Sequence, residues 1–320
     1  MSDTQDHLSG AGSLEAAMRV QLMQGDAVAQ EARPILRHLL QQDSNDLFSE
    51  EIVARVKGMI RSLANALQDA IFADDHYTEA AQRDMVENDF FHLLVVDEAM
   101  LQHLHAMALE YQVTQRLQAR LSLDAVTSPL VRELIASSDM QLQSLAMAYL
   151  AAQARWCQSQ RRMAITVAEL PAAQFDVIMA ALHGVAAEHS VVGERLPDCV
   201  RRLKEARGLG RCRLDLARSI VDALPVDAEK ALSIEHAGVG LFVSTLAGAL
   251  GEVRDQVAFS LHASQSARLL LQLRAAGLRA AAVELQFVMI HPGLPLPMGI
   301  ETLGADRAAE VLAQSGRAVA

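Results

Sequence analysis

Residues 49–70, SEEIVARVKGMIRSLANALQDA, decide the fold class of this chain. Apolar side chains recur at positions 52, 56, 59, 63, 67 and 70, with spacings of 4, 3, 4, 4 and 3. This spacing places them on one face of an α-helix, and Ser49 stands where an N-cap is expected. The stretch therefore predicts an amphipathic helix that buries one face.

The same kind of pattern predicts further helices along the chain. Residues 89–117 read as one central helix, 140–163 as another, and 266–290 as a leucine-rich pair divided at Gly277. A last short helix is expected over 304–314. Four prolines are interpreted as helix starts, because proline is well accommodated in the first turn; they are Pro129, Pro171, Pro197 and Pro225.

The composition supports an all-α fold. Hydrophobic residues make up 51% of the 320 residues but aromatic residues only 4%, whereas strands favour aromatic and β-branched side chains. Two segments, which begin at Glu169 and at Ala223, each contain a Leu-Pro dipeptide and, further along, a histidine close to a glycine. This similarity suggests a repeat of about 53 residues. We expect about 12–14 stacked helices, in a repeating or irregular array.

The distribution of charge along the chain and a break in the helical periodicity suggest the domain organisation. Residues 1–110 hold 19 acidic and 7 basic side chains, a net of −12, while the whole chain carries −11, so the remainder carries +1. We expect a disordered tail over 1–12, an acidic N-terminal helical domain over 13–122 and a C-terminal helical domain over 126–317. The C-terminal domain should include an extended proline-rich segment, 291–299.

The cysteines and the start of the chain favour the cytoplasm. Cys157, Cys199 and Cys212 are odd in number and form no C-x-x-C, so reduced thiols are expected. The start, MSDTQDHLSGAGS, has neither the basic nor the apolar region of a secretory signal. The longest uncharged apolar run, 236–251, is too short to span a bilayer and predicts a buried helix.

Searches for catalytic and cofactor motifs are negative. Phosphate-binding glycine loops, H-E-x-x-H and G-x-S-x-G do not occur, so we expect no cofactor and no catalytic residue. Asp89-x-x-His92 is one half of a dimetal motif without its partner, and no metal is expected. A core pocket near Asp97, Glu98, His103 or Tyr111 is kept as an alternative, for an enzyme or a small-ligand-binding domain.

A basic segment is the main positive feature. Residues 195–218 contain eight basic and three acidic side chains, which gives a net charge of +5. The candidate partner- or anion-binding residues are Arg195, Arg201, Arg202, Lys204, Arg207, Arg211 and Arg213, and a secondary basic group comprises Arg155, Arg161 and Arg162. These charges either form a binding surface or are solvated helix faces paired with local acids.

Several phrases resemble a family of uncharacterised bacterial helical proteins, described as a domain of unknown function. They are AYLAAQARWCQSQRRM at 148–163, ELPAAQF at 169–175, SARLLLQLRAAGL at 266–278 and VELQFVMIHPGLPLPMGIETL at 283–303. The resemblance covers roughly residues 140–303. It implies a HEAT-like all-α fold and supplies no activity or site residue.

The function expected from these features is a noncatalytic helical scaffold or regulatory module. Its partner should be another protein, at the basic segment or at the acidic first third. A membrane partner is not expected, and the acidic first third disfavours nucleic acid. Anion or nucleic-acid binding through residues 195–218 is the lesser alternative.

Overall fold

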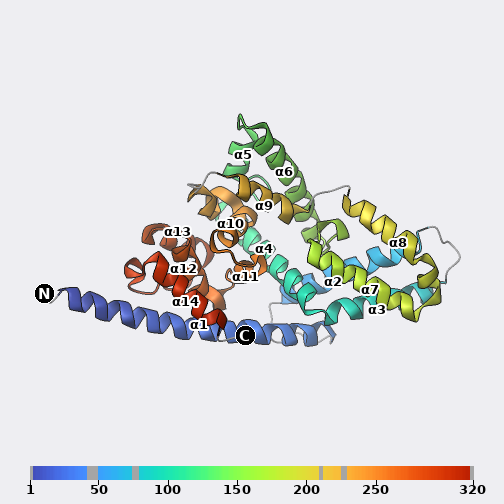
Figure 1. Ribbon diagram of the computed structural model, residues 1–320, viewed down its shortest axis with the longest axis horizontal. Helices are drawn as coiled ribbons and strands as arrows, with labels where there is room; N and C mark the ends of the chain where they lie inside the picture. The colour runs from blue at the N-terminus through green and yellow to red at the C-terminus, as the bar shows by residue number, and fades with distance from the viewer. Residues whose placement is uncertain (1–2, 42–49, 74–78, 209–211, 225–228, 318–320) are drawn as a thin grey trace. The chain divides into compact units, whose positions relative to one another are not determined.

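The computed structural model describes residues 3–41, 50–73, 79–208, 212–224 and 229–317. Over these ranges the chain forms α-helices, short 3-10 helices and no strand (Figure 1). The predicted all-α fold of stacked helices is therefore confirmed, and the fourteen α-helices of these ranges agree with the predicted number. HEAT-like stacking and the repeat of about 53 residues stay predictions.

The described helices follow one another in this order: α1 (Asp3–Gln41), α2 (Glu50–Ile71), α3 (Ala80–Val96), α4 (Glu98–Leu121), α5 (Pro129–Ile135), α6 (Met140–Arg161), η1 (Val167–Glu169), α7 (Ala172–Glu188), α8 (Ser190–Gly208), α9 (Arg213–Ala223), η2 (Glu229–Leu232), α10 (Ile234–Leu250), α11 (Arg254–Phe259), η3 (Ala263–Gln265), α12 (Ser266–Ala275), α13 (Ala280–Ile290), η4 (Ile300–Thr302) and α14 (Ala305–Arg317).

The chain divides into two compact units, each built from separate segments. Unit 1 comprises Met1–Ala32, Leu109–Ser138 and Ile220–Ala320, and unit 2 comprises Arg33–Ala108 and Asp139–Ser219. The sequence predicts two domains that follow one another along the chain, with a boundary between residues 122 and 126. The compact units are instead made of separate segments, so they do not correspond to those domains, and the predicted boundary stays a prediction.

Unit 1 is organised around the two apolar helices α10 and α12. α12 packs against α14 and α13, and α10 packs against α5, α11 and η2 (Figure 1). The apolar run 236–251 lies within α10 and its cap and is largely buried, as predicted. α10 bends at Gly238, where φ is +74° and ψ is +159°, and a Cβ at this position would come 3.2 Å from Ser128 Cβ.

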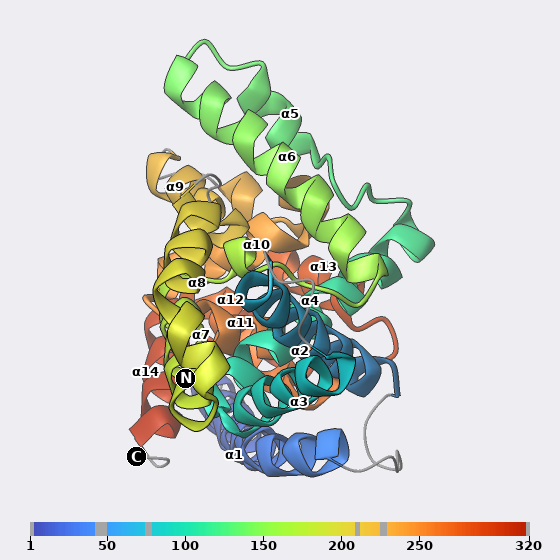
Figure 2. The same ribbon diagram turned by 90° about the vertical axis from the view of Figure 1, so that its right-hand side faces the viewer.

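Unit 2 is a stack of helices in which α2 packs against α3 and α8, and α7 against α3 and α8. Figure 2 shows α7 and α8 side by side. The face of α2 predicted from its spacing is buried, including Ile52, Val56, Met59, Leu63 and Leu67. Ser49, the predicted N-cap, lies outside the described residues.

The predicted helix starts at proline are correct in two cases and wrong in one. Pro129 begins α5 beneath its cap Ser128, and Pro171 is the N-cap of α7. Pro197 lies inside α8, because Val192 and Cys199 are buried on the same face before and after it and hold the helix together. Pro225 lies outside the described residues.

Three other predicted boundaries can be compared with the structure. The expected helix 89–117 is divided at Asp97, whose backbone is extended and whose carboxylate accepts a hydrogen bond from the Met100 N–H at 2.8 Å. The pair over 266–290 is divided at Gly277, where φ is +90°, as predicted. The segment 291–299 is non-helical, also as predicted.

The N-terminal residues differ from the expected disordered tail over 1–12. Helix α1 begins at Asp3, while residues 1 and 2 lie outside the described part of the chain. Leu14, Met18 and Leu22 are buried along one side of α1 and fix its next turns in unit 1. Once those turns are formed, adding further residues to the helix end costs little, which explains the longer helix.

Within the described ranges, no helix combines the length and the apolar character that crossing a membrane requires.

Candidate functional site

Helix α8 carries most of the predicted basic residues, but they do not share one face. The Arg195 guanidinium lies over the Phe72 ring, 5.2 Å from its centroid, and the Arg207 guanidinium lies 4.6 Å from the centroid of Phe175. Both arginines are half-buried where α8 meets the rest of unit 2. Their charges are therefore partly engaged by aromatic rings of the same unit.

The outward face of α8 is mixed in charge. Arg201 Nη2 lies 2.9 Å from Asp198 Oδ1, and Arg201 Nη1 lies 3.5 Å from Glu205 Oε1. The hydrogen bond from Arg201 lowers the pKa of the Asp198 carboxyl, which keeps this acid ionised beside the base. Lys204 is exposed, Arg202 is half-buried and Arg211 lies outside the described residues. The outward face of α8 thus carries nearby acids that reduce its positive potential.

Arg213 is buried, with 1% of its surface exposed, and is not available to a surface partner. Its guanidinium lies 4.0 Å from the centroid of the Trp156 indole, and Nη1 donates to Gln153 Oε1 at 3.2 Å. The Arg213 backbone N–H donates to Glu169 Oε2, also at 3.2 Å. Arg213 lies three and four residues before the apolar Leu216 and Ala217, which are buried. This helical spacing puts position 213 on the inner face of α9, and it is the signal in the sequence for the burial of Arg213.

The secondary basic group lies on a different surface. Arg155 and Arg161 belong to α6 and Arg162 is its C-cap; all three are exposed. Figure 2 shows α6 as a long unbroken helix. Residues 140–162 contain no Asp or Glu, so the side chains on α6 itself give it a positive charge.

The exposed side of α6 also carries two methionines. Met140 is 82% exposed and Met147 is 57% exposed. Ser144, Ala151 and Arg155 are exposed as well, and spacings of 4, 3, 4 and 4 put all five residues on one side. We call Met140, Ser144, Met147, Ala151 and Arg155 the α6 methionine face. The sequence predicts a helix over 140–163, and the signal for this face is the helical spacing of these five positions.

The residues of the alternative core pocket have structural roles. Asp97 caps the start of α4, and Glu98 Oε1 lies 3.3 Å from Arg37 Nη2. His103 is buried in unit 2 and Tyr111 is buried in unit 1. Asp97 and Glu98 are thus held by contacts with other residues, and His103 and Tyr111 are covered by packing.

The half-motif Asp89-x-x-His92 is engaged elsewhere. Asp89 Oδ2 lies 2.7 Å from His189 Nε2, while His92 is exposed. Among the residues that the structure describes, no group of three or more His, Cys, Asp and Glu side chains could hold a metal ion.

The three cysteines are buried and free of disulfides. Burial raises the pKa of the Cys199 thiol to about 11, and burial also raises the pKa of Cys212. The Cys212 thiol donates to the Glu169 carbonyl oxygen at 3.1 Å. Since the thiolate is the reactive form, these two cysteines are poor nucleophiles near neutral pH.

Unit 1 contains a pair of histidines beside an arginine. His291 is buried, and burial, followed by the charges of His262 and Arg116, lowers its pKa to about 4. Its Nε2 atom has no hydrogen-bond partner among the described residues. The Ser264 hydroxyl oxygen lies 2.8 Å from His262 Nδ1. Near neutral pH this buried histidine is therefore uncharged.

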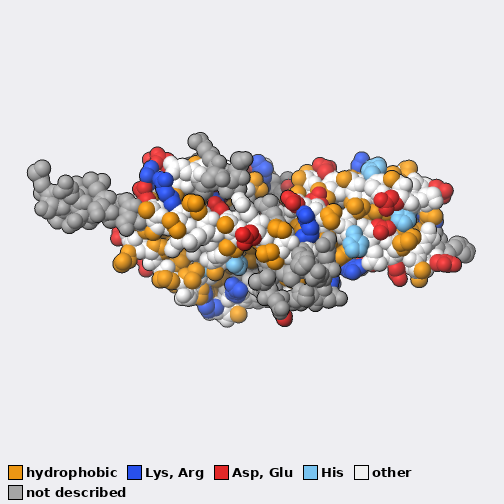
Figure 3. All heavy atoms as spheres, turned by 90° about the horizontal axis from the view of Figure 1, so that it is seen from below, with side chains coloured by type: hydrophobic (Ala, Val, Ile, Leu, Met, Phe, Trp, Pro, Cys, Tyr) orange, Lys and Arg blue, Asp and Glu red, His pale blue; other side chains and the backbone are white. Residues whose placement is uncertain are grey.

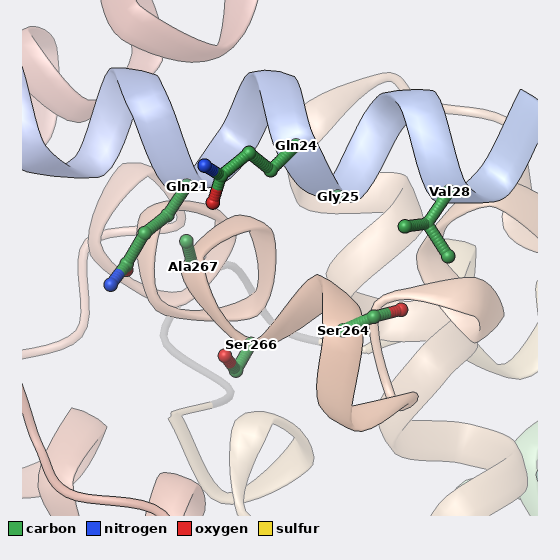
Figure 4. Close-up of a pocket in the computed structure, with 7 residues that line it drawn as sticks. All are labelled: Gln21, Gln24, Gly25, Val28, Ser264, Ser266 and Ala267. Carbon is green, nitrogen blue, oxygen red and sulfur yellow. The ribbon is translucent and has the colours of Figure 1, made fainter.

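A surface pocket lies between α1 and the start of α12 (Figure 4). It has a volume of about 250 Å³ and is lined by Gln21, Gln24, Gly25, Val28, Ser264, Ser266 and Ala267. α1 approaches η3 closely there: a Cβ added to Gly25 would lie only 2.7 Å from the Ser264 carbonyl oxygen. The amides and hydroxyls of the lining could hold a small uncharged ligand by hydrogen bonds, and none of the lining residues is ionisable.

Comparisons with protein-family models, with curated proteins and with solved structures find no match to this chain. The family resemblance described above therefore stays an expectation.

Proposed function

We propose that this chain is a noncatalytic helical module that binds another protein through the α6 methionine face. The partner it fits is an amphipathic helix with apolar side chains next to acidic ones. The observation that carries the proposal is the exposure of Met140 and Met147 on a helix that has no acidic residue.

The methionines supply the apolar part of this surface. Met140 and Met147 are seven residues apart, about two helical turns, so both can contact one partner helix. Methionine is flexible and polarisable, which suits it to surfaces that adapt to a partner. Ser144 and Ala151 are small and allow a helix to approach α6 between and beside the methionines.

The charges on α6 indicate the sign of the partner. Arg155 lies at the end of the methionine face, and Arg161 and Arg162 follow at the C-terminal end of the helix. Arginine binds carboxylates with two parallel hydrogen bonds, which gives both attraction and orientation. An acidic partner would therefore be attracted to a basic, partly apolar surface on a chain whose net charge is −11.

The noncatalytic part of the proposal is supported by the roles of the polar candidates. Asp97 caps a helix, Arg213 stacks on Trp156, and the thiols of Cys199 and Cys212 are held protonated by burial. Anion or nucleic-acid binding through the basic residues of α8 stays a prediction, with less support because acids and aromatic rings engage several of those residues.

Affinity purification of the full-length protein from its native cells tests the proposal. The wild type is compared with the double variant Met140→Glu/Met147→Glu, and with Met85→Glu as a control at an exposed methionine of α3 in the same unit. We expect a stoichiometric partner with the wild type and the control, and at least a tenfold loss with the double variant. Equal recovery with all three proteins, or no stoichiometric partner, would contradict the proposal.

The purified partner then tests the chemistry of the contact. Arg155→Glu should weaken binding and reduce its dependence on salt, since one attractive charge pair is replaced by a repulsive one. Circular dichroism and thermal unfolding of each variant establish that the fold is retained. An unchanged salt dependence would exclude an acidic contact at this residue.

A further inference from the structure

A group of basic side chains gathers in unit 1 where the C-terminal end of α4 meets the C-terminal end of α13. Arg120 Nη2 donates a hydrogen bond to the Met289 carbonyl oxygen, which ties the two helix ends together. Arg116 lies one turn before Arg120 on the same side of α4. His291 is the C-cap of α13, two residues after Met289. The fold therefore brings Arg116 and His291 together from distant parts of the sequence.

His262 joins this group from the position before η3. Its Nδ1 atom accepts a hydrogen bond from the Ser264 backbone N–H at 3.3 Å, so the neutral ring carries its proton on Nε2 and can donate from there. The His262 side chain reaches the surface. Partial burial, followed by the charge of Arg116, lowers the pKa of His262. The two side chains are thus close enough for their charges to interact.

Within the described ranges, the charge of this group is not neutralised by an acid. Arg116 is exposed and has no ion pair there. His291 is 6% exposed, its Nε2 atom lacks a hydrogen-bond partner in the same ranges, and both of the charges that lower its pKa are basic. In Figure 3, Lys or Arg side chains lie beside a His side chain near the lower edge of the left half of the view. Like charges that gather in this way, next to a buried polar atom without a partner, are costly unless an anion joins them.

We propose that Arg116, His262 and His291 form a binding site for a phosphate group. The Arg116 guanidinium can donate two parallel hydrogen bonds to phosphate oxygens, and His262 Nε2–H can donate a third. The imidazole of His291 closes the buried side of the site. We call these three residues the unit 1 phosphate site.

The arrangement of the donors favours phosphate over a carboxylate. The three side chains come from α4, from the segment before η3 and from the end of α13, so they approach a ligand from different directions. A tetrahedral phosphate offers acceptor oxygens in several directions and up to two negative charges, whereas a carboxylate offers two oxygens in one plane. Because Arg116 and His262 lie at the surface, the ligand can be free phosphate or the phosphate group of a small ester.

NMR spectra of the histidine rings in the full-length protein test the site. Inorganic phosphate is added up to about 20 mM, with chloride used to hold the ionic strength constant. The ring signals of His262 and His291, assigned with His262→Asn and His291→Gln, should shift and saturate. A bound anion stabilises the charged imidazole, so the pKa of His291 should rise from about 4 by about 1 or more.

Two variants and a matched control test the donors. Arg116→Gln should weaken phosphate binding about tenfold or more, because it removes the guanidinium from an exposed position without disturbing the core. His262→Asn keeps an acceptor for the Ser264 N–H but removes the Nε2–H donor, and it should weaken binding about threefold or more. Arg132→Gln, at an exposed arginine of α5 in the same unit, should bind phosphate like the wild type.

This site is independent of the proposed function, because the α6 methionine face lies in unit 2. Met140→Glu/Met147→Glu should therefore bind phosphate like the wild type, and a failure of either proposal leaves the other standing.

Glycerol 3-phosphate and acetate, titrated in the same way, identify the ligand. Tighter binding of glycerol 3-phosphate than of inorganic phosphate would assign the site to a phosphate ester, and the reverse order would assign it to the free ion. Acetate should bind more weakly than both. The proposal is overturned if phosphate gives no saturable shift of His262 and His291, if chloride or acetate gives the same shift, or if Arg116→Gln binds phosphate as tightly as Arg132→Gln.

Discussion

Glu110 in unit 1 and Arg213 in unit 2 are buried charged side chains with different surroundings. In unit 1, the fully buried Glu110 forms an ion pair with Arg254 at 2.8 Å, and Arg254 also donates to Ser244 Oγ at 3.0 Å. In unit 2, the Arg213 guanidinium lies over Trp156 and donates to the neutral amide oxygen of Gln153. An ion pair makes each partner depend on the opposite charge of the other, whereas stacking on an aromatic ring and a hydrogen bond to an amide are contacts with uncharged groups.

The ion pair of unit 1 should show the largest effect on stability. Arg254→Ala leaves the buried Glu110 carboxylate without its arginine, and we expect a loss of about 3–5 kcal/mol in the free energy of unfolding. Urea unfolding followed by circular dichroism measures this loss. The matched variant Glu110→Leu/Arg254→Met removes both charges and should recover most of the stability. If that double variant is as unstable as Arg254→Ala, the buried charge is not the cause.

Acid should weaken unit 1 through His291. The pKa of this histidine is about 4 in the folded protein, below the value near 6.5 of an exposed histidine. Between these values the unfolded chain binds a proton that the folded protein does not, so stability falls as pH decreases from 6.5 to 4 and is unaffected by this group above 6.5.

The variant His291→Gln tests this sign. The free-energy difference between wild type and variant should change by up to about 3 kcal/mol between pH 7 and pH 4, in the direction that favours the variant in acid. Urea titrations of both proteins at each pH give the difference. A difference that does not vary with pH would show that the proton affinity of His291 is unchanged by folding.

The stacked arginine of unit 2 should show a smaller effect than the ion pair of unit 1. Arg213→Ala removes the contact with Trp156 and a hydrogen bond to Gln153, and we expect a loss of about 2 kcal/mol. Arg213→Lys should not restore this stability, because an ammonium lacks the planar guanidinium that covers the indole. Thermal and urea unfolding measure both variants. Full stability in the lysine variant would mean that charge alone is sufficient.

The exposed ion pairs of α8 should have the smallest effect on stability among these contacts. Arg201 contacts Asp198 and Glu205 at the surface, where water and salt screen the attraction. Arg201→Ala should leave the midpoint of thermal unfolding unchanged within error. A clear decrease in that midpoint would show that the acidic and basic side chains of α8 act as a stabilising network.

Periodic apolar spacing predicted the helices well, and local polar contacts explain where it failed. The buried face of α2 and the division at Gly277 follow from positions that sequence alone reveals. The break at Asp97 was missed because the apolar pattern continues through it. The helix ends there through one hydrogen bond from a backbone N–H to a carboxylate.

The candidate sites were harder to predict than the helices. A count of basic residues over 195–218 could not distinguish Arg213, which is covered by an indole, from Arg201, which is in water. The α6 methionine face includes Met140 and Met147, and methionine is a residue type that is usually expected in a core. Only the packing of each helix decides which of its apolar residues stay outside.

The bend in α10 restricts the chirality of the residue that can occupy position 238. At Gly238 the backbone has φ +74° and ψ +159°, a combination that L-amino acids essentially never adopt. For a D-amino acid the same angles correspond, by mirror symmetry, to a backbone at the edge of the extended region of an L-residue. A chemically assembled chain with D-alanine at this position should therefore keep the bend, whereas L-alanine would oppose it through both its backbone and its contact with Ser128.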